Sequence, residues 1–210
     1  MENARNVIKI VAMGDSTTAG TPGFLSPLES PPNGAGDKES QYSYWLMQKH
    51  PDWNVLNRGI NGERSDQILA RFRRNVIEEE PEIAVILAGV NDIYQGLPSE
   101  YAARNLSMMY SMATQADIIP VSCTVLPYNT MGAKEAEVRR KLNAWIESES
   151  RRLGIPFTDT AEAASDPRNR DMLAGSPDGH HPDAAGYRKM ADAIARTIED
   201  CLSRGRAGQG

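Results

Sequence analysis

The sequence has little cysteine: only Cys123 and Cys201 occur among 210 residues. Proteins held together by disulfides need several cysteine pairs, so this chain has to rely on a buried hydrophobic core. Cys123 falls in an apolar run typical of a strand, where a free cysteine behaves as a small buried hydrophobic residue. Two unpaired thiols suit a reducing compartment. We therefore expect a cytoplasmic protein, and the alternative is a secreted protein whose signal has been removed.

The sequence also lacks a long hydrophobic run. A helix that crosses a bilayer needs roughly 20 apolar residues, and no stretch approaches that length. The first apolar run, residues 7–13, is also too short to act as a secretory signal. With 40% hydrophobic and 24% charged residues the composition is that of a globular protein. We expect no stable membrane insertion and a single domain over residues 1–202, followed by a flexible tail at 203–210.

An excess of positive charge is absent as well. Lys and Arg number 23 against 28 Asp and Glu, which gives a net charge of −5. Because binding to nucleic acid depends on neutralising phosphates, this balance argues against a nucleic-acid partner. It leaves a small molecule as the expected partner, and the oligomeric state stays open. Histidine is scarce too, since only three histidines occur, so the candidates for acid–base chemistry are few.

Short apolar runs alternate with stretches of helical periodicity along the chain. This alternation predicts an α/β fold, with a five-stranded, mostly parallel sheet between two layers of helices. The strands are expected at 7–13, 53–57, 83–88, 117–123 and 155–158, and the helices at 40–50, 65–80, 99–115, 134–153 and 183–202. Residues 20–40 are rich in Gly, Pro and Ser, and we expect a long loop there and a second, polar loop at 160–177.

Polar groups follow three of the predicted strands. Ser16 stands in the segment GDST after the first strand, Gly59 in NRG after the second, and Asn91 in GVND after the third. Ligands of parallel sheets bind at the carboxyl ends of the strands, where these residues would meet. A serine hydroxyl there can act as a nucleophile, and an asparagine amide can stabilise a developing oxyanion. Each residue also has a structural reading: a helix cap for Ser16, a turn for Gly59 and an Asx-turn for Asn91.

The segment DGHHP before the last predicted helix contains two of the histidines. Asp178 precedes His181 by three residues, so a single turn can fold its carboxylate onto one imidazole nitrogen and leave the other free for Ser16. From their chemistry alone, His180 and His181 are hard to tell apart as candidates for the base. A metal site made of Asp178, His180, His181 and Asp183 is a weaker alternative, because no further group of ligands is apparent elsewhere in the sequence. We predict that no metal or other cofactor is needed.

These four segments, in this order, resemble the SGNH or GDSL-type hydrolases, and the resemblance runs from Val7 to about Ile198. It implies a flavodoxin-like SGNH hydrolase fold and a serine esterase that works through a covalent acyl-enzyme. Ser16 would then be the nucleophile, His181 the general base and Asp178 its support. The oxyanion donors would be the N–H of Ser16, the N–H of Gly59 and the side chain of Asn91. The sequence departs from the family at Thr17, where the family name implies leucine, and in the proline-rich stretch after Ser16.

The resemblance leaves the substrate open. The family includes esterases, lipases, lysophospholipases, thioesterases and carbohydrate acetylesterases. Loops near the predicted edge carry side chains that could shape an acyl or alcohol pocket: Phe24, Tyr94, Leu126, Pro127 and Tyr128. A flavodoxin-like module that binds flavin or phosphate through residues 16–21 is an alternative of another class. It would leave GVND and DGHHP unexplained. A binding protein without activity on the same scaffold is a third.

Overall fold

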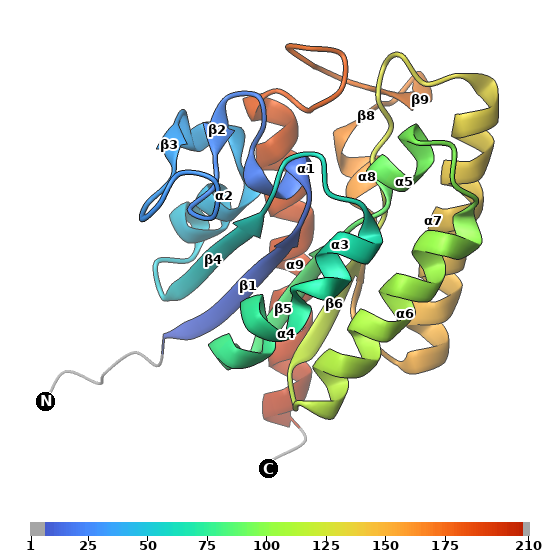
Figure 1. Ribbon diagram of the computed structural model, residues 1–210. Helices are drawn as coiled ribbons and strands as arrows, with labels where there is room; N and C mark the ends of the chain where they lie inside the picture. Colours follow the sequence, from blue (N-terminus) through green and yellow to red (C-terminus); the bar gives the residue numbers. More distant parts are fainter. Residues whose placement is uncertain (1–6, 208–210) are drawn as a thin grey trace, which may run out of the picture.

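The computed structural model describes residues 7–207, which form a parallel sheet between two layers of helices (Figure 1). The sheet has five strands in the order β4-β1-β5-β6-β7. The strands are β1 (Ile8–Gly14), β4 (Trp53–Gly59), β5 (Ile83–Leu87), β6 (Ile119–Cys123) and β7 (Phe157–Thr158). All four pairings between neighbours are parallel. The predicted α/β fold is confirmed.

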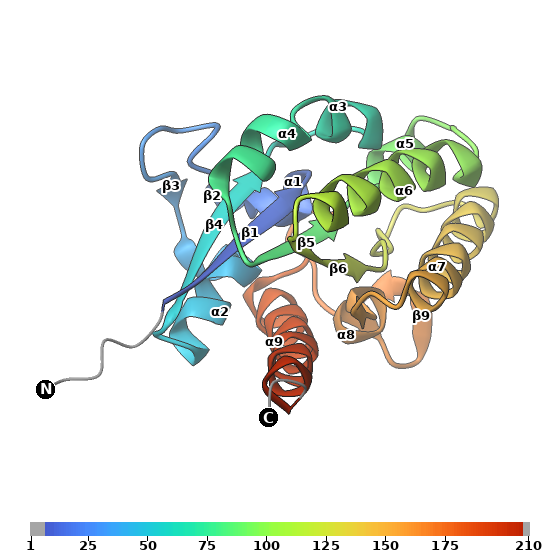
Figure 2. The ribbon, with the colours of Figure 1, turned by 90° about the horizontal axis from the view of Figure 1, so that it is seen from below.

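Side chains alternate between the two faces of the sheet, and each face has its own hydrophobic core. From β1, Ile10 and Ala12 join one core and Val11 and Met13 the other. The first core is covered by α2 (Tyr42–Lys49), α8 (Thr160–Ala164) and α9 (Ala184–Ala207). The second is covered by α3 (Ser65–Ala70), α4 (Phe72–Asn75), α6 (Ser99–Gln115) and α7 (Ala133–Leu153). Figure 2 shows the two layers on opposite sides of the strands.

The predicted helix over 65–80 is interrupted. It divides into α3, α4 and a 3-10 turn, η2 (Ile77–Glu79). The break comes at Arg71, whose backbone leaves the helical conformation at φ −103° and ψ 5°. The Arg71 guanidinium reaches back to the ends of two strands, donating to the carbonyl oxygens of Gly14 and Arg58. Apolar periodicity does continue across the break, because Ile68, Phe72 and Val76 all enter the same core.

Both predicted loops contain secondary structure. Residues 20–40 include the short hairpin of β2 (Phe24–Leu25) and β3 (Ala35–Gly36) and the 3-10 turn η1 (Lys38–Ser40). Residues 160–177 hold α8 and the pair β8 (Ser165–Asp166) and β9 (Asn169–Leu173). The last helix passes its predicted end at 202 and continues to Ala207, so the expected tail is helical over 203–207. Residues 208–210 lie outside the described chain.

Register brings the ends of the three central strands to one line. Gly14, at the end of β1, pairs with Gly59 of β4 on one side and with Leu87 of β5 on the other. The segments that leave these strands therefore start side by side. They are α1 (Ser16–Ala19), the turn after β4, and α5 (Val90–Tyr94). Of the helices within residues 7–207, none combines the length and apolar character needed to cross a bilayer.

Candidate active site

Ser16 opens α1, directly beyond the end of β1. The Asp15 side chain caps this helix by accepting the Thr17 N–H at 2.9 Å. Position 14 has room only for glycine, because a Cβ there would lie 2.2 Å from the Thr18 hydroxyl and 2.4 Å from the Leu87 carbonyl oxygen. The tight turn holds Ser16 at the sheet edge with its hydroxyl facing the last loop of the fold.

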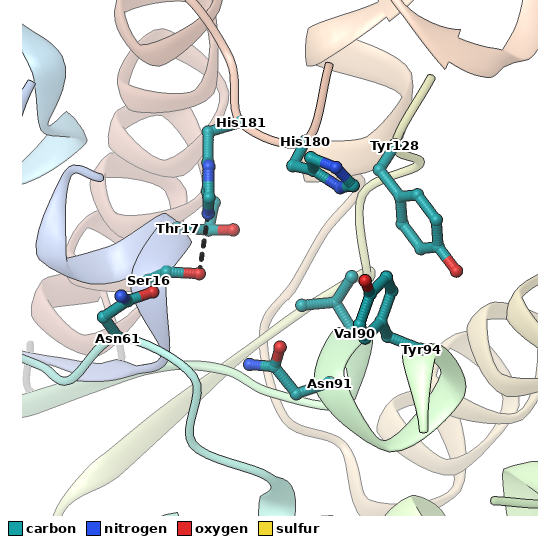
Figure 3. Close-up of a pocket in the computed structure, with 9 residues that line it drawn as sticks. All are labelled: Ser16, Thr17, Asn61, Val90, Asn91, Tyr94, Tyr128, His180 and His181. Carbon is teal, nitrogen blue, oxygen red and sulfur yellow. Dashed lines mark hydrogen bonds between the residues drawn. The ribbon is translucent and has the colours of Figure 1, made fainter. Parts of the chain in front are cut away.

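The last loop places His181 against that hydroxyl. The His181 Nε2 lies 2.9 Å from the Ser16 Oγ, although the two residues are 165 positions apart (Figure 3). The other ring nitrogen, Nδ1, lies 2.7 Å from the Asp178 Oδ2. The Ser176 hydroxyl donates to the His181 carbonyl oxygen at 2.6 Å and holds the loop. The three side chains expected from the sequence thus form one continuous chain of hydrogen bonds.

The carboxyl group of Asp178 is negatively charged at neutral pH. Burial by itself raises the pKa of the carboxyl, but hydrogen bonds from the His181 ring and from the N–H groups of His180 and His181 outweigh it and lower the pKa to about 2. The carboxylate is therefore ionised at neutral pH and accepts the proton on Nδ1. That leaves the Nε2 lone pair facing Ser16, the tautomer that a general base requires.

Asn91 lies across the site from Ser16, in the first turn of α5. Its Nδ2 donates one hydrogen to the Glu63 carbonyl oxygen at 2.9 Å. A side-chain amide has two such hydrogens, so the second remains for a ligand. Figure 3 shows the amide at the foot of the pocket, below Ser16 and His181. Gly89, with φ +126°, gives the turn before it, and a Cβ there would lie 2.8 Å from the Leu142 side chain.

Gly59 does not have the role expected from the sequence. Its N–H donates to the Asn57 Oδ1 at 3.0 Å, and its carbonyl oxygen accepts the Ser26 hydroxyl at 2.6 Å. It is the final residue of β4 rather than part of the turn that follows, and it does not line the pocket. Glycine is needed for packing, because a Cβ would lie 2.1 Å from the Ala19 nitrogen. The Gly59 N–H, predicted to be an oxyanion donor, is therefore already bonded within the protein.

Two other backbone donors beside the pocket are free. Across residues 7–207, neither the Ser16 N–H nor the Gly62 N–H has a hydrogen-bond acceptor. Gly62 adopts φ +78° and directly follows Asn61, which lines the pocket next to Ser16 (Figure 3). The sequence did carry a signal for this turn, since Asn-Gly pairs favour positive φ. This turn lies three residues beyond Gly59.

Arg71 ties the three segments of the site together. Its Nη2 donates to the Gly14 carbonyl oxygen at 2.9 Å and its Nη1 to that of Arg58 at 2.8 Å. Its Nε lies 2.6 Å from the Glu63 carboxylate, and the Glu63 carbonyl is the acceptor for Asn91. The arginine therefore fixes the end of β1 before Ser16, the end of β4, and the residue that orients Asn91. No local pattern in the sequence points to Arg71, because its partners lie on distant strands.

Asp92 has the structural role that its position after Asn91 indicates. Its two oxygens accept the Ser65 N–H at 2.9 Å and the Ser65 hydroxyl at 2.6 Å. These bonds connect the start of α3 to α5, and Asn105 adds a bond to the Ser65 hydroxyl. Burial raises the pKa of the Asp92 carboxyl, and the Ser65 hydrogen bonds oppose that effect. The carboxylate holds the loops in place and does not line the pocket.

The pocket beside the triad has one polar wall and one aromatic wall. Its lining residues are Ser16, Thr17, Asn61, Val90, Asn91, Tyr94, Tyr128, His180 and His181. Tyr94 and Tyr128 were expected there. The other three candidates, Phe24, Leu126 and Pro127, do not line it. The side chains of His180 and His181 point in different directions. The His180 ring stacks on Tyr128 at a centroid distance of 5.7 Å and takes no part in the triad.

A metal or phosphate site finds little support in these residues. In the part of the chain that the structure describes, no three His, Cys, Asp or Glu side chains are grouped to hold an ion. Asp183 instead accepts the Gly186 N–H at 2.8 Å within the start of α9. The segment proposed as a phosphate loop forms the four-residue α1, and its first hydroxyl is bonded to His181.

Known proteins that are similar to this chain are described as esterases or as a lipase. An arylesterase of Vibrio mimicus is 29% identical over 57% of this chain, a match that spans 56% of the arylesterase and so less than two thirds of it. An acetylxylan esterase of Geobacillus stearothermophilus is 24% identical over 69% of this chain and 71% of its own. The crystal structure of a GDSL-like lipase from Bacteroides thetaiotaomicron superposes with a TM-score of 0.70 at 25% identity, covering 96% of this chain and 92% of that one.

A family model accounts for most of the sequence. The model of the GDSL-like lipase/acylhydrolase family matches residues 12–189, which span the chain from the end of β1 to the start of α9. The match includes Ser16, Asn91 and the Asp178–His181 segment, the residues that the fold brings to one edge of the sheet. The chain therefore belongs to the GDSL-like lipase/acylhydrolase family.

Proposed function

We propose that this chain, a member of a family of ester-cleaving hydrolases, cleaves carboxylic esters through a covalent acyl-enzyme on Ser16. The observation that carries the proposal is the chain of hydrogen bonds from Ser16 through His181 to Asp178, at 2.9 and 2.7 Å. Nucleophile, base and orienting carboxylate are already in contact, which is the geometry that acyl transfer by a serine requires.

In the first step the His181 Nε2 takes the proton from the Ser16 hydroxyl as Oγ attacks the ester carbonyl carbon. The carbonyl π electrons move to oxygen and form a tetrahedral oxyanion. When this intermediate collapses, the bond to the alcohol oxygen breaks, and that oxygen takes the proton from Nε2. Water then attacks the acyl-serine with His181 again as base, which releases the acid and restores Ser16. Asp178 stabilises the imidazolium in both steps.

The oxyanion needs preorganised donors. Free donors beside the pocket include the Ser16 N–H, the second Asn91 Nδ2 hydrogen and the Gly62 N–H. We assign the oxyanion hole to these three groups and withdraw Gly59, because its N–H is bonded to Asn57. Donors of this kind stabilise charge that develops only in the transition state, which is why they increase kcat.

The relatives guide the choice of first substrates. One is named an arylesterase and another an acetylxylan esterase, and both names support oxygen esters over thioesters. We therefore propose acetyl esters as the first substrates to test, p-nitrophenyl acetate and acetylated xylose among them. A series of p-nitrophenyl esters with longer acyl chains would then measure the largest acyl group that the site accepts.

The decisive experiment compares two serine variants. Ser16→Ala should lower kcat by a factor on the order of 10⁴ to 10⁶, while the melting temperature stays near that of the wild type. Ser111→Ala, an exposed serine on α6, is the matched control and should keep full activity. If Ser16→Ala retained more than a tenth of the activity, the assignment would be wrong. Ser16-dependent turnover would also exclude a binding protein without activity.

The base is tested in the same assay. His181→Ala should be nearly as damaging as Ser16→Ala, because the hydroxyl then has no proton acceptor within hydrogen-bond distance. His50→Ala is the matched control, since His50 stacks on Trp53 at 3.8 Å at the far end of α2. Equal activity of the two histidine variants would contradict the proposed base.

A further inference from the structure

Three aromatic rings meet in the pocket and take no part in the triad. The His180 ring lies over Tyr128 at 5.7 Å with an angle of 30° between the planes. The Tyr94 ring makes T-shaped contacts with both, with centroid distances of 6.1 Å to His180 and 5.8 Å to Tyr128. The rings come from three separate segments: α5, the loop after β6, and the loop before α9. We call His180, Tyr94 and Tyr128 the aromatic wall.

The aromatic wall is partly anchored and partly open. Tyr128 is 3% exposed and is fixed in the protein, whereas Tyr94 is 59% exposed and His180 is exposed as well. Figure 3 shows the wall across the pocket from Ser16 and Asn61, with the Tyr128 hydroxyl directed away from Ser16. The pocket therefore meets the rings of the wall and not the phenol group of Tyr128. Ring surface of this kind stacks with flat apolar groups.

The proposed mechanism assigns a direction to each part of the ester. The oxyanion has to face Asn91, and the alcohol oxygen has to face the His181 Nε2, which protonates it. Figure 3 places His180 and Tyr128 at the level of His181, whereas Val90 and Tyr94 lie lower, beside Asn91. The side of the pocket next to His181 is the side on which the alcohol leaves. The stacked pair of His180 and Tyr128 therefore borders the alcohol and not the oxyanion.

The charge of the lining narrows the class of alcohol. None of the nine lining residues is Asp, Glu, Lys or Arg. A phosphate-bearing alcohol would gain no ion pair there and would lose hydration on entry. A neutral alcohol with a ring loses less hydration and gains stacking on His180. A linear alkyl chain has no flat face with which to match the ring.

We infer that His180, supported by Tyr128, forms the subsite for the alcohol part of the ester and selects alcohols that carry no anionic group and have a six-membered ring with an apolar face. The shared chemistry is an apolar ring face, which an aromatic alcohol and a sugar both offer. This inference rests on the proposed function, because the direction of the leaving alcohol follows from His181 acting as the general acid.

The test compares two acetates of primary alcohols, benzyl acetate and pentyl acetate, so that the acyl group and the class of leaving group are the same. The wild type should show a higher kcat/KM for the benzyl ester. His180→Ala should lower the benzyl-to-pentyl ratio by about 2- to 10-fold, the range expected for one aromatic stacking contact. His180→Phe keeps a ring and should keep the ratio. His50→Ala is the remote histidine control and should leave the ratio unchanged.

A second arm identifies the source of the ring. Methyl 4-O-acetyl-xylopyranoside replaces benzyl acetate, and His180→Ala should lower its kcat/KM relative to pentyl acetate if the subsite takes sugars. Loss in the benzyl arm alone assigns aromatic alcohols, and loss in the sugar arm alone assigns sugars. Loss in neither arm overturns the inference.

Two further results would also overturn it: a wild-type ratio of one or less in both arms, or a His180→Phe variant that loses the ratio as fully as His180→Ala. Because His180 is exposed, these variants are expected to fold, and melting curves check this. The proposed function fails separately. Turnover of these esters that survives Ser16→Ala would refute the mechanism itself. Turnover that depends on Ser16, with ratios indifferent to His180, would refute only the alcohol subsite.

Discussion

Asp15, the residue before Ser16, should make the protein less stable as the pH rises from 5 to 8. The side chain is 1% exposed and accepts the Thr17 N–H at 2.9 Å. Burial raises the pKa of this carboxyl to about 7, against the hydrogen bond from Thr17 and with the help of the negative charges of Asp92 and Glu63. Tyr42, Arg71 and Tyr187 are the other ionisable groups whose titration Asp15 affects.

The direction of this pH dependence follows from the pH at which the folded and the unfolded state each lose the proton. The unfolded chain releases it near the usual value of 3.8, and the folded protein keeps it up to about 7. Between these values the folded state binds one proton more, so the free energy of unfolding falls as the pH rises. Stability from this group is fully present below pH 3.8 and is lost through pH 7. At 1.36 kcal/mol per pH unit, about two units between pH 5 and 7 correspond to about 3 kcal/mol.

Asp15→Asn isolates this contribution. Asparagine has the same shape, keeps an oxygen for the Thr17 N–H and does not titrate. Urea unfolding at pH 5, 6, 7 and 8 should show that the variant loses about 3 kcal/mol less than the wild type across this range. Asp200→Asn, at an exposed carboxylate on α9, is the control and should leave the pH dependence unchanged. If Asp15→Asn and wild type had equal slopes, Asp15 would already be ionised at pH 5 and the reasoning would fail.

Three further outcomes are expected. Asn91→Ala should lower kcat by roughly 10² to 10³ with little change in KM, because an oxyanion donor acts in the transition state; full kcat in a stable variant would exclude that role. Arg71→Met should lower the free energy of unfolding by roughly 3 kcal/mol, because it leaves Glu63 and two strand-end carbonyls without their donor, and it should lower kcat per folded molecule as well. Unchanged kcat would show that Arg71 does not position Asn91. Dialysis against EDTA should leave kcat unchanged, and activity that returned only with a divalent ion would contradict a metal-free mechanism.

Most of the fold could be predicted because its signals are local. A fully buried strand such as β5 reads as one apolar run, and α6 has the bounds that its periodicity predicts. The regions that were missed depend on distant partners. The 65–80 stretch keeps helical periodicity, yet it breaks at Arg71 to reach Gly14 and Arg58. The loop over 160–177 folds around bonds such as Thr160 Oγ1 to the Thr124 carbonyl oxygen, which no local pattern reveals.

In the candidate site, too, the sequence could predict what depends on local spacing but not what depends on distant contacts. Asp178 and His181 could be paired from their spacing, because both lie in one turn. The sequence could not show whether the N–H of Gly59 or that of Gly62 stays free for an oxyanion, because this depends on where β4 ends. Pairing of Gly59 with Gly14 extends this strand by two residues past its predicted end at 57, and Asn57 then takes the Gly59 N–H. The turn that remains free is the one at Gly62.

One carboxylate, that of Asp178, sets the different directions of the two adjacent histidine side chains. Asp178 Oδ1 accepts the N–H groups of both His180 and His181, each at 2.9 Å, and Gly179 completes the turn with φ +80°. This turn aims consecutive side chains in different directions, so the ring of His181 reaches Ser16 while that of His180 reaches Tyr128. The second oxygen of Asp178 then sets the tautomer of His181. The same residue thus builds the loop, prepares the base and presents the ring that we propose selects the alcohol, so chemistry and specificity share a single structural origin.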